Sequence, residues 1–227
     1  MKKYVNIKEE LFIEVEHDVW AESPRTWDNL WTIYTWENRH DSPDKNPFPS
    51  FDHFIEDHFT EKQVMNLDKH RTTGKEHFAA LERYFARIGY LVAPVNRYEH
   101  GSVIYSVSTR TGWDYGVVGI AIVSYDELRY QYISKAVTEE VKKRALKLLE
   151  LELKEYTAWA NGEVYTASLT NFDGECIDSI SQIYGDTMED VVKTYINFSD
   201  HRFEDFRLMD IVERIRKTYE VQEVIQS

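Results

Sequence analysis

The feature that most constrains the fold is a near-continuous apolar run from Val117 to Val123, with the sequence VVGIAIV. Its large side chains are all β-branched, and the small residues Gly119 and Ala121 stand between them. Such a run is typical of a strand that is covered on both faces. A glycine inside a strand indicates that another segment approaches closely. The run therefore predicts a central strand over residues 117–123, with a helix or a neighbouring strand against Gly119.

Shorter patterns predict the elements around this strand. Alternating or β-branched segments predict strands at residues 11–16, 31–36, 90–95 and 103–108, and a hairpin over 163–182 that turns at Phe172-Asp173-Gly174. Apolar residues at helical spacing predict helices near 51–59, 75–88, 125–132, 138–160, 187–198 and 203–219. Ser50 and Ser124 are suitable N-caps, and Gly89 is a suitable helix stop. The helix over 138–160 should be continuous, because its first-turn acids and its apolar face agree.

The order of these elements predicts the fold class. Strands occur both in runs and between helices, without regular βαβ alternation, which favours an α+β fold with a largely antiparallel mixed sheet and helices packed on one face. We expect the 163–182 hairpin to join the sheet of the 117–123 strand, because a separate two-stranded ribbon is only marginally stable. Only the proline-rich stretch 38–50 interrupts the pattern. The sequence thus predicts a single domain over residues 1–227, with an irregular loop at 38–50.

Composition restricts the class of function and the compartment. The net charge is −13, which disfavours direct binding of nucleic acid through its phosphates. Cys176 is the single cysteine, so neither an intramolecular disulfide nor a cysteine-based zinc site can form, and a reducing cytoplasm fits. No apolar run approaches the ~18 residues of a membrane helix, and the first residues lack a signal-peptide core. We expect a cytoplasmic protein without membrane contact.

The stretch that leads into the apolar run is the first candidate site. Gly112 and Gly116 bracket Trp113-Asp114 and permit a sharp turn. On a structural interpretation, Trp113 is largely buried and Asp114 hydrogen-bonds backbone amides of the turn or of the Trp27-Asp28 loop. On a functional interpretation, the pair binds a ligand or partner.

A second Trp-Asp step occurs in Trp27-Asp28-Asn29, among turn-forming residues. If the two steps meet in space, they form one aromatic and acidic pocket. The binding candidates are therefore Trp27, Asp28, Asn29, Trp113, Asp114 and Gly116. Sequence alone leaves open whether the two steps are structural or functional.

A histidine-rich and aspartate-rich region calls for a test of metal binding. His53 and Asp57 stand four residues apart on the predicted helix, a spacing that can present two ligands to one ion, and His40 lies in the loop before it. No second strong ligand pair accompanies them. The chain also lacks a nucleophile elbow, a Walker A loop and a dinucleotide-binding glycine pattern. No catalytic residue and no cofactor is expected, and a metal-dependent hydrolase using His53 and Asp57 stays as an alternative.

Several segments together resemble a family of small, acidic and largely uncharacterised proteins carried by bacteriophages, plasmids and integrative elements. The resemblance rests on segments between residues 10 and 185, namely SPRTWDNLWTIYTW, RHDSPDK, Trp113 to Ile120, SYDELRYQY, Gly162 to Tyr165 and DGECIDS. Where the family has Trp-Gly-Phe-Tyr-Gly after its Asp-Ser, this chain has Ile180 to Gly185. Tyr165 joins the binding candidates through its place in this pattern.

The resemblance implies a cytoplasmic accessory protein of a mobile element rather than a particular chemistry. It suggests interference with host defence, either through an acidic surface or through a pocket for a small ligand. The expected partner is a host protein or nucleoprotein with a basic surface, or a small ligand. A small globular binding protein of unassigned role is the alternative. The sequence leaves the oligomeric state open.

Overall fold

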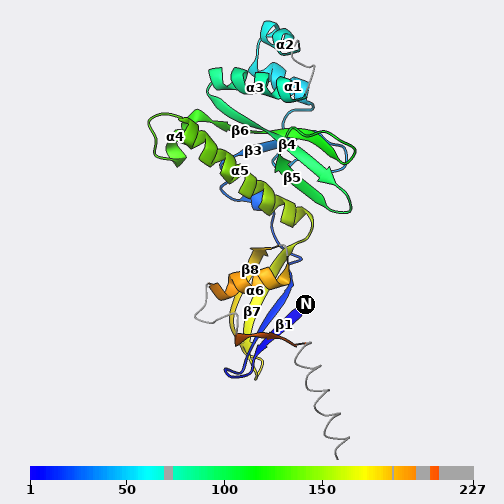
Figure 1. Cartoon of the computed structure of the whole chain (residues 1–227), viewed down its shortest axis with the longest axis vertical. Helices are drawn as coiled ribbons and strands as arrows, with labels where there is room; N and C mark the ends of the chain where they lie inside the picture. The colour runs from blue at the N-terminus through cyan, green and yellow to red at the C-terminus, as the bar shows by residue number, and fades with distance from the viewer. Residues whose placement is uncertain (69–73, 186, 198–204, 210–227) are drawn as a thin grey trace, which may run out of the picture. The chain divides into compact units, whose positions relative to one another are not determined.

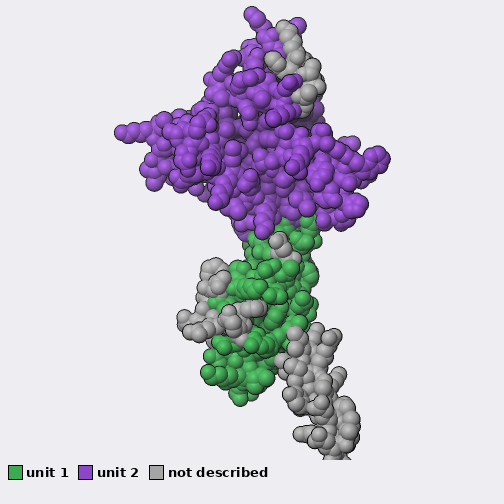
Figure 2. All heavy atoms as spheres, in the orientation of Figure 1, with its two compact units in different colours: residues 1–22, 158–227 green, residues 23–157 purple. Residues whose placement is uncertain are grey.

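The computed structural model describes residues 1–68, 74–185, 187–197 and 205–209. The fold is α+β, as the sequence predicts, and every strand pair is antiparallel. The chain divides into two compact units, residues 1–22 with 158–227 (unit 1) and residues 23–157 (unit 2; Figure 2). The expectation of a single domain over residues 1–227 stays a prediction.

Unit 1 is built on a five-stranded sheet in the order β8-β7-β2-β1-β9 (Figure 1). Its strands are β1 (Lys2–Asn6), β2 (Leu11–His17), β7 (Val164–Asn171), β8 (Cys176–Tyr184) and β9 (Arg207–Leu208). Helix α6 (Met188–Asn197) packs its apolar face on the sheet and closes a core that includes Ile13, Ala167 and Val192. The alternation read from residues 11–16 points the buried side chains of β2 into this core.

Unit 2 is built on a four-stranded sheet in the order β3-β6-β4-β5. Its strands are β3 (Thr32–Thr35), β4 (Tyr90–Glu99), β5 (Val103–Val107) and β6 (Tyr115–Ser124), and its helices are α1 (Phe51–His58), α2 (Glu61–Asp68), α3 (Gly74–Arg87), α4 (Tyr125–Gln131) and most of α5 (Glu139–Ala160). Helices α1 to α3 lie on one side of this sheet and α5 on the other (Figure 1). Both faces are thus covered in this unit, where a single helical layer was expected.

The apolar run forms β6, which pairs with β3 on one side and β4 on the other. Gly119 stands opposite Thr35, and a Cβ atom added to it would lie 2.0 Å from the Tyr34 carbonyl oxygen and 2.9 Å from the Thr35 Cα atom. The close approach predicted from this glycine is confirmed. It comes from the neighbouring strand rather than from a helix.

Local capping signals set the helix ends as the sequence predicts. The Ser50 hydroxyl accepts a hydrogen bond from the His53 amide at the start of α1. Ser124 and Glu127 form a capping box at the start of α4. Gly89, with a φ of 88°, follows α3. Helix α5 is continuous over 22 residues, so the predicted helix at 138–160 is confirmed. No helix in the described ranges has both the length and the apolar character to cross a bilayer.

Several expectations fail, and long-range strand pairing decides most of these outcomes. The 163–182 hairpin forms β7 and β8, but it pairs with β2 and not with the sheet of β6. Strands β1 and β9 were not predicted. Strand β9 occupies residues 207–208 of the helix expected over 203–219, whose residues 203–204 and 210–219 lie outside the described part. Helix α2 was also missed. Residues 38–50 contain neither helix nor strand, as predicted.

Candidate binding site

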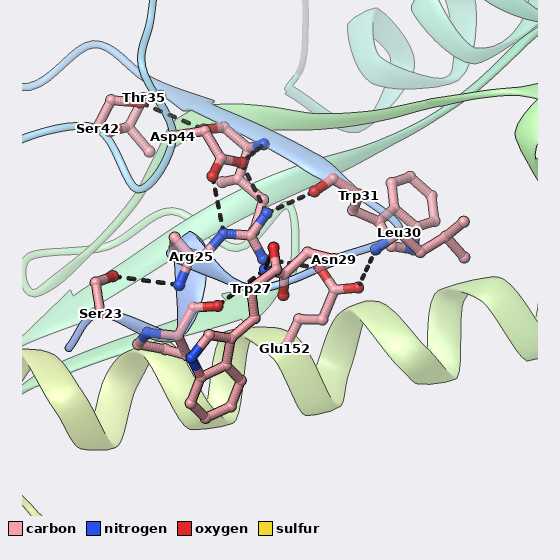
Figure 3. Close-up of polar contacts among 12 residues, drawn as sticks. Ser23, Arg25, Trp27, Asn29, Leu30, Trp31, Thr35, Ser42, Asp44 and Glu152 are labelled. Carbon is pink, nitrogen blue, oxygen red and sulfur yellow. Dashed lines mark hydrogen bonds and ion pairs between the residues drawn. The ribbon is translucent and has the colours of Figure 1, made fainter. Parts of the chain in front are cut away.

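The loop that carries the first Trp-Asp step is anchored by Arg25. This residue lies in a short 3₁₀ turn, Pro24–Thr26, which is capped by Ser23. Its guanidinium Nε and Nη2 atoms donate to Asp44 Oδ1 at 3.0 Å and Oδ2 at 2.7 Å, and Nη1 donates to Glu152 Oε2 at 2.8 Å (Figure 3). Nη2 also donates to the Trp31 carbonyl oxygen. One side chain thereby joins the 38–50 loop, the residue that precedes β3, and α5.

The three charged groups of this anchor are largely shielded from water. The side chains of Arg25 and Glu152 are 4% and 6% exposed, and that of Asp44 is 18% exposed. Burial raises the pKa of the Glu152 carboxyl, and the hydrogen bond and charge of Arg25 oppose this effect. Burial alone would lower the pKa of Arg25, but Asp44 and Glu152 outweigh it and leave the pKa raised. The anchor therefore holds a cation between two anions in a fixed geometry.

The same anchor fixes the main chain of residues 27–31. Glu152 Oε1 accepts the Leu30 amide at 3.0 Å, and the Asn29 side-chain amide donates to the Pro24 and Trp27 carbonyl oxygens at 2.8 and 3.0 Å. The Trp31 indole is buried, and its Nε1 donates to the Ala145 carbonyl oxygen of α5 at 2.9 Å. The Trp27 indole is left 42% exposed and projects over α5 (Figure 3).

Trp27 forms one wall of a pocket of about 500 Å³, called here the Trp27 pocket. A second ring, that of Tyr130 at the end of α4, is 87% exposed. The remaining lining consists of acidic, amide and leucine side chains, and it contains no lysine, arginine or histidine: Asp28, Asn29, Leu30, Glu127, Gln131, Leu148, Glu152 and Glu155. The sequence candidates Trp27, Asp28 and Asn29 are thus brought together in one site.

The four carboxylates of the Trp27 pocket differ in their partners. Both oxygens of Glu152 are engaged, and Glu127 Oε2 accepts from the Ser124 amide and hydroxyl. Asp28 and Glu155 have no hydrogen bond or ion pair with any described residue. Burial raises the pKa of the Glu155 carboxyl, and the nearby charge of Glu152 raises it further. Two anionic groups of the pocket are therefore left without a counter-ion from the described chain.

The second Trp-Asp step lines a different pocket, of about 530 Å³, called here the Trp113 pocket. Its lining is Arg39, Arg97, Glu99, Gly101, Trp113, Asp114, Tyr115, Gly116 and Val118. No residue lines both this pocket and the Trp27 pocket. The suggestion that the two Trp-Asp steps form one site is therefore wrong, although Asp114 and Gly116 do share a site with Trp113.

The structural interpretation of Trp113 and Asp114 is also wrong. Trp113 is fully exposed, with a relative accessibility of 101%. The turn is closed by main-chain groups, because the Gly112 amide donates to Tyr115 and the Glu99 amide donates to the Asp114 carbonyl oxygen, at 3.1 and 3.2 Å. The Asp114 carboxylate makes no hydrogen bond to a described amide and lies 4.0 Å from His100 Nδ1. The bracketing glycines permit the turn, but the turn directs the indole outward.

A second ionic network includes two residues that line the Trp113 pocket, Arg97 and Glu99. Arg97 pairs with Glu37 through Nη1 and with Glu99 through Nη2, the latter at 3.0 Å, and the Tyr105 hydroxyl donates to Glu37 at 3.1 Å. Burial raises the pKa of the Glu37 carboxyl, and Arg97 opposes that rise. Burial and the charge of Glu37 raise the pKa of Tyr105 well above its ordinary value. Arg97 and Glu99 are therefore engaged with each other rather than free for a ligand.

The other candidates do not form a site together. Tyr165 is a buried core residue of unit 1 and lines neither pocket. His53 and Asp57 lie on an exposed face of α1, where His53 Nδ1 is 2.7 Å from the Ser50 hydroxyl. His40 Nε2 lies 3.8 Å from Glu99. Within the described ranges, no three His, Cys, Asp or Glu side chains are placed to hold one metal ion.

Sequence reasoning missed Arg25, Glu152 and Tyr130. A signal for Glu152 was present, since this acid falls on the apolar stripe of α5, four residues after Leu148 and four before Tyr156. An acid on a buried stripe requires a partner. Nothing in the local sequence names Arg25 as that partner.

Comparison with known proteins returns no relative for this chain: no family model matches it, and neither does any curated protein or solved structure.

Proposed function

We propose that the chain is a non-enzymatic binding protein whose Trp27 pocket captures a positively charged group of its partner. The observation that carries the proposal is the composition of the pocket lining, which has two aromatic rings and four carboxylates and no basic side chain. An aromatic face attracts a cation through its quadrupole, and carboxylates complete the charge complementarity.

The carboxylates of the pocket that have no partner favour the binding of an organic cation. Asp28 and Glu155 lack partners among the described residues, and Glu155 is partly buried. A cation that enters the pocket neutralises these groups and covers the exposed rings of Trp27 and Tyr130. A lysine or arginine side chain has this chemistry, as does a small organic ammonium ion.

The resemblance to mobile-element proteins supplies the wider proposal. In that setting, the chain is an accessory protein of a phage or related element, and its partner is a host protein or nucleoprotein with a basic surface. Capturing a basic side chain from such a surface would block its use in host defence. The net charge of −13 favours encounter with a basic partner.

The direct test is calorimetric titration of the full chain with tetramethylammonium and with the amide of N-acetyl-arginine. Trp27→Ala should weaken binding of either cation by roughly 2- to 30-fold, the range expected for a cation–π contact of about 0.5–2 kcal/mol. Trp20→Ala is a matched control, because Trp20 is 89% exposed and does not line the Trp27 pocket.

Binding that survives unchanged in Trp27→Ala, or equal loss in Trp20→Ala, would contradict the proposal. Absence of heat with both cations at millimolar concentration would also contradict it. Titration with acetate in place of the cation checks that the signal depends on positive charge.

A further inference from the structure

The Trp113 pocket is separate from the Trp27 pocket and has a different chemistry. Its wall is an indole with a relative accessibility of 101%, next to the half-exposed ring of Tyr115. Tyr115 is held in place by the Tyr98 ring, whose centroid is 4.6 Å away. A fully exposed tryptophan contributes nothing to the core, and its face is free to stack on a planar ligand.

The polar groups around this wall include one free donor and one free acceptor. Arg39 is exposed and has no hydrogen bond or ion pair with any described residue. The Asp114 carboxylate accepts no hydrogen bond from the described chain, and His100 Nδ1 lies 4.0 Å from its Oδ2 atom. Arg97 and Glu99 are already paired at 3.0 Å. The lining of the pocket therefore offers a ligand both a guanidinium fork and a carboxylate.

We infer that the Trp113 pocket is a binding site for a free guanine nucleoside. Guanine presents two acceptors, O6 and N7, that match the donor fork of an arginine such as Arg39. Its adjoining Watson–Crick edge carries N–H donors at N1 and N2, which match the Asp114 carboxylate. The ring stacks on Trp113. The pocket volume of about 530 Å³ exceeds that of a base and accommodates the ribose.

The same chemistry discriminates against other bases. Adenine has an acceptor at N1 where guanine has a donor, so its ring nitrogen faces the Asp114 carboxylate without a hydrogen bond. Pyrimidines offer less surface for stacking on Trp113. The net charge of −13 opposes a polymer of phosphates, which favours the free nucleoside over nucleic acid.

The test is ligand-detected saturation-transfer NMR and calorimetry of the full chain with guanosine, adenosine and cytidine. Guanosine should bind, and adenosine and cytidine should bind at least about tenfold more weakly. Trp113→Ala, Arg39→Ala and Asp114→Asn should each reduce guanosine affinity by roughly tenfold. All three side chains are exposed or partly exposed, so melting curves should show the variants folded.

Trp20→Ala is again the control and should bind guanosine like the parent chain, because Trp20 is an exposed tryptophan that does not line the Trp113 pocket. The inference is overturned if guanosine gives no signal at its solubility limit, or if adenosine binds equally well. It is also overturned if Trp113→Ala retains full affinity. Since the cation titration concerns the other pocket, its outcome leaves this test unaffected.

Discussion

The two Trp-Asp steps share a dipeptide and have opposite environments. Trp27-Asp28 lies on a loop that Arg25 and Glu152 tie to α5, and Trp27 is 42% exposed beside a second ring. Trp113-Asp114 lies in a turn closed by main-chain bonds, and Trp113 is fully exposed. The first step forms part of an acidic pocket, whereas the second stands in a pocket that also contains arginine.

The difference arises from contacts between distant residues rather than from the dipeptide. Arg25 and Glu152 are separated by 127 positions, and Leu30 and Glu152 by 122. The Trp113 turn is closed by groups within a few residues of one another and by Glu99 of the adjacent strand. The environment of a Trp-Asp pair is therefore set by the distant residues that the fold places around it. The predictions below test this contrast, beginning with the largest effect.

Replacing Arg25 should cause the largest loss of stability. In Arg25→Ala, Asp44 and Glu152 remain buried without their cation, and breaking such a buried network costs about 3–5 kcal/mol. The matched change in the other pocket is Arg39→Ala, which removes an exposed guanidinium and should alter the free energy of unfolding by less than about 0.5 kcal/mol. Urea denaturation of both variants measures the contrast.

Similar losses in Arg25→Ala and Arg39→Ala would show that the Arg25 anchor does not stabilise the fold. Arg25→Lys adds a control, because it keeps the charge and removes the fork that reaches Asp44 with two nitrogens. Its free energy of unfolding should lie between those of the parent chain and Arg25→Ala.

The sequence predicted the elements of the fold better than their arrangement. Helix α5, β6, the capped helices and the β7–β8 hairpin follow from local periodicity, capping and turn residues. The assignment of strands to two sheets does not, because β2 and β6 are both apolar enough to accept the hairpin. Likewise, Trp27, Asp28 and Asn29 were named as candidates, but the partners that build their pocket lie on distant helices.

Trp113 shows why part of the site could not be predicted. Its bracketing glycines permit a turn that directs the indole either inward or outward. The next strand begins at Tyr115, and its first residues are not covered, since Tyr115 and Val117 are 44% and 43% exposed. An apolar run gives no indication of where along its length the covering helices end. That boundary is set by the tertiary structure.

The tryptophans themselves should give the second-largest contrast in stability. Trp27→Ala removes a ring that is more than half buried and should destabilise the chain by about 1–2 kcal/mol through lost apolar contact. Trp113→Ala removes a fully exposed ring and should change stability by less than about 0.5 kcal/mol. Thermal unfolding of the two variants provides the measurement. A larger loss in Trp113→Ala would mean that its indole is covered in solution.

Cation binding in the Trp27 pocket should depend on pH through Glu155. Its folded pKa lies above the ordinary value of 4.5, because of burial and then of Glu152, and only the ionised form attracts a cation. Affinity is therefore full above the raised pKa and falls as the pH drops through it, by at most about tenfold per pH unit for one proton. Titrations with tetramethylammonium from pH 7.5 down to pH 4 measure the slope. Glu155→Gln should bind more weakly at pH 7.5 and should show a flatter profile.

The smallest effect concerns the carboxylates without partners, and it distinguishes a binding group from a structural one. Because its folded pKa is raised, ionised Glu155 opposes folding, and stability declines as the pH rises through that pKa. Glu155→Gln should therefore leave the chain equally stable at pH 7 or up to about 0.5 kcal/mol more stable, although cation binding weakens. Asp114→Asn should also stay within about 0.5 kcal/mol, since the Asp114 carboxylate bonds no described amide and the turn is closed by its carbonyl oxygen. Denaturation at pH 7 and pH 5 measures both variants. A loss of more than about 1 kcal/mol in either would assign that carboxylate to the framework and remove it from its proposed site.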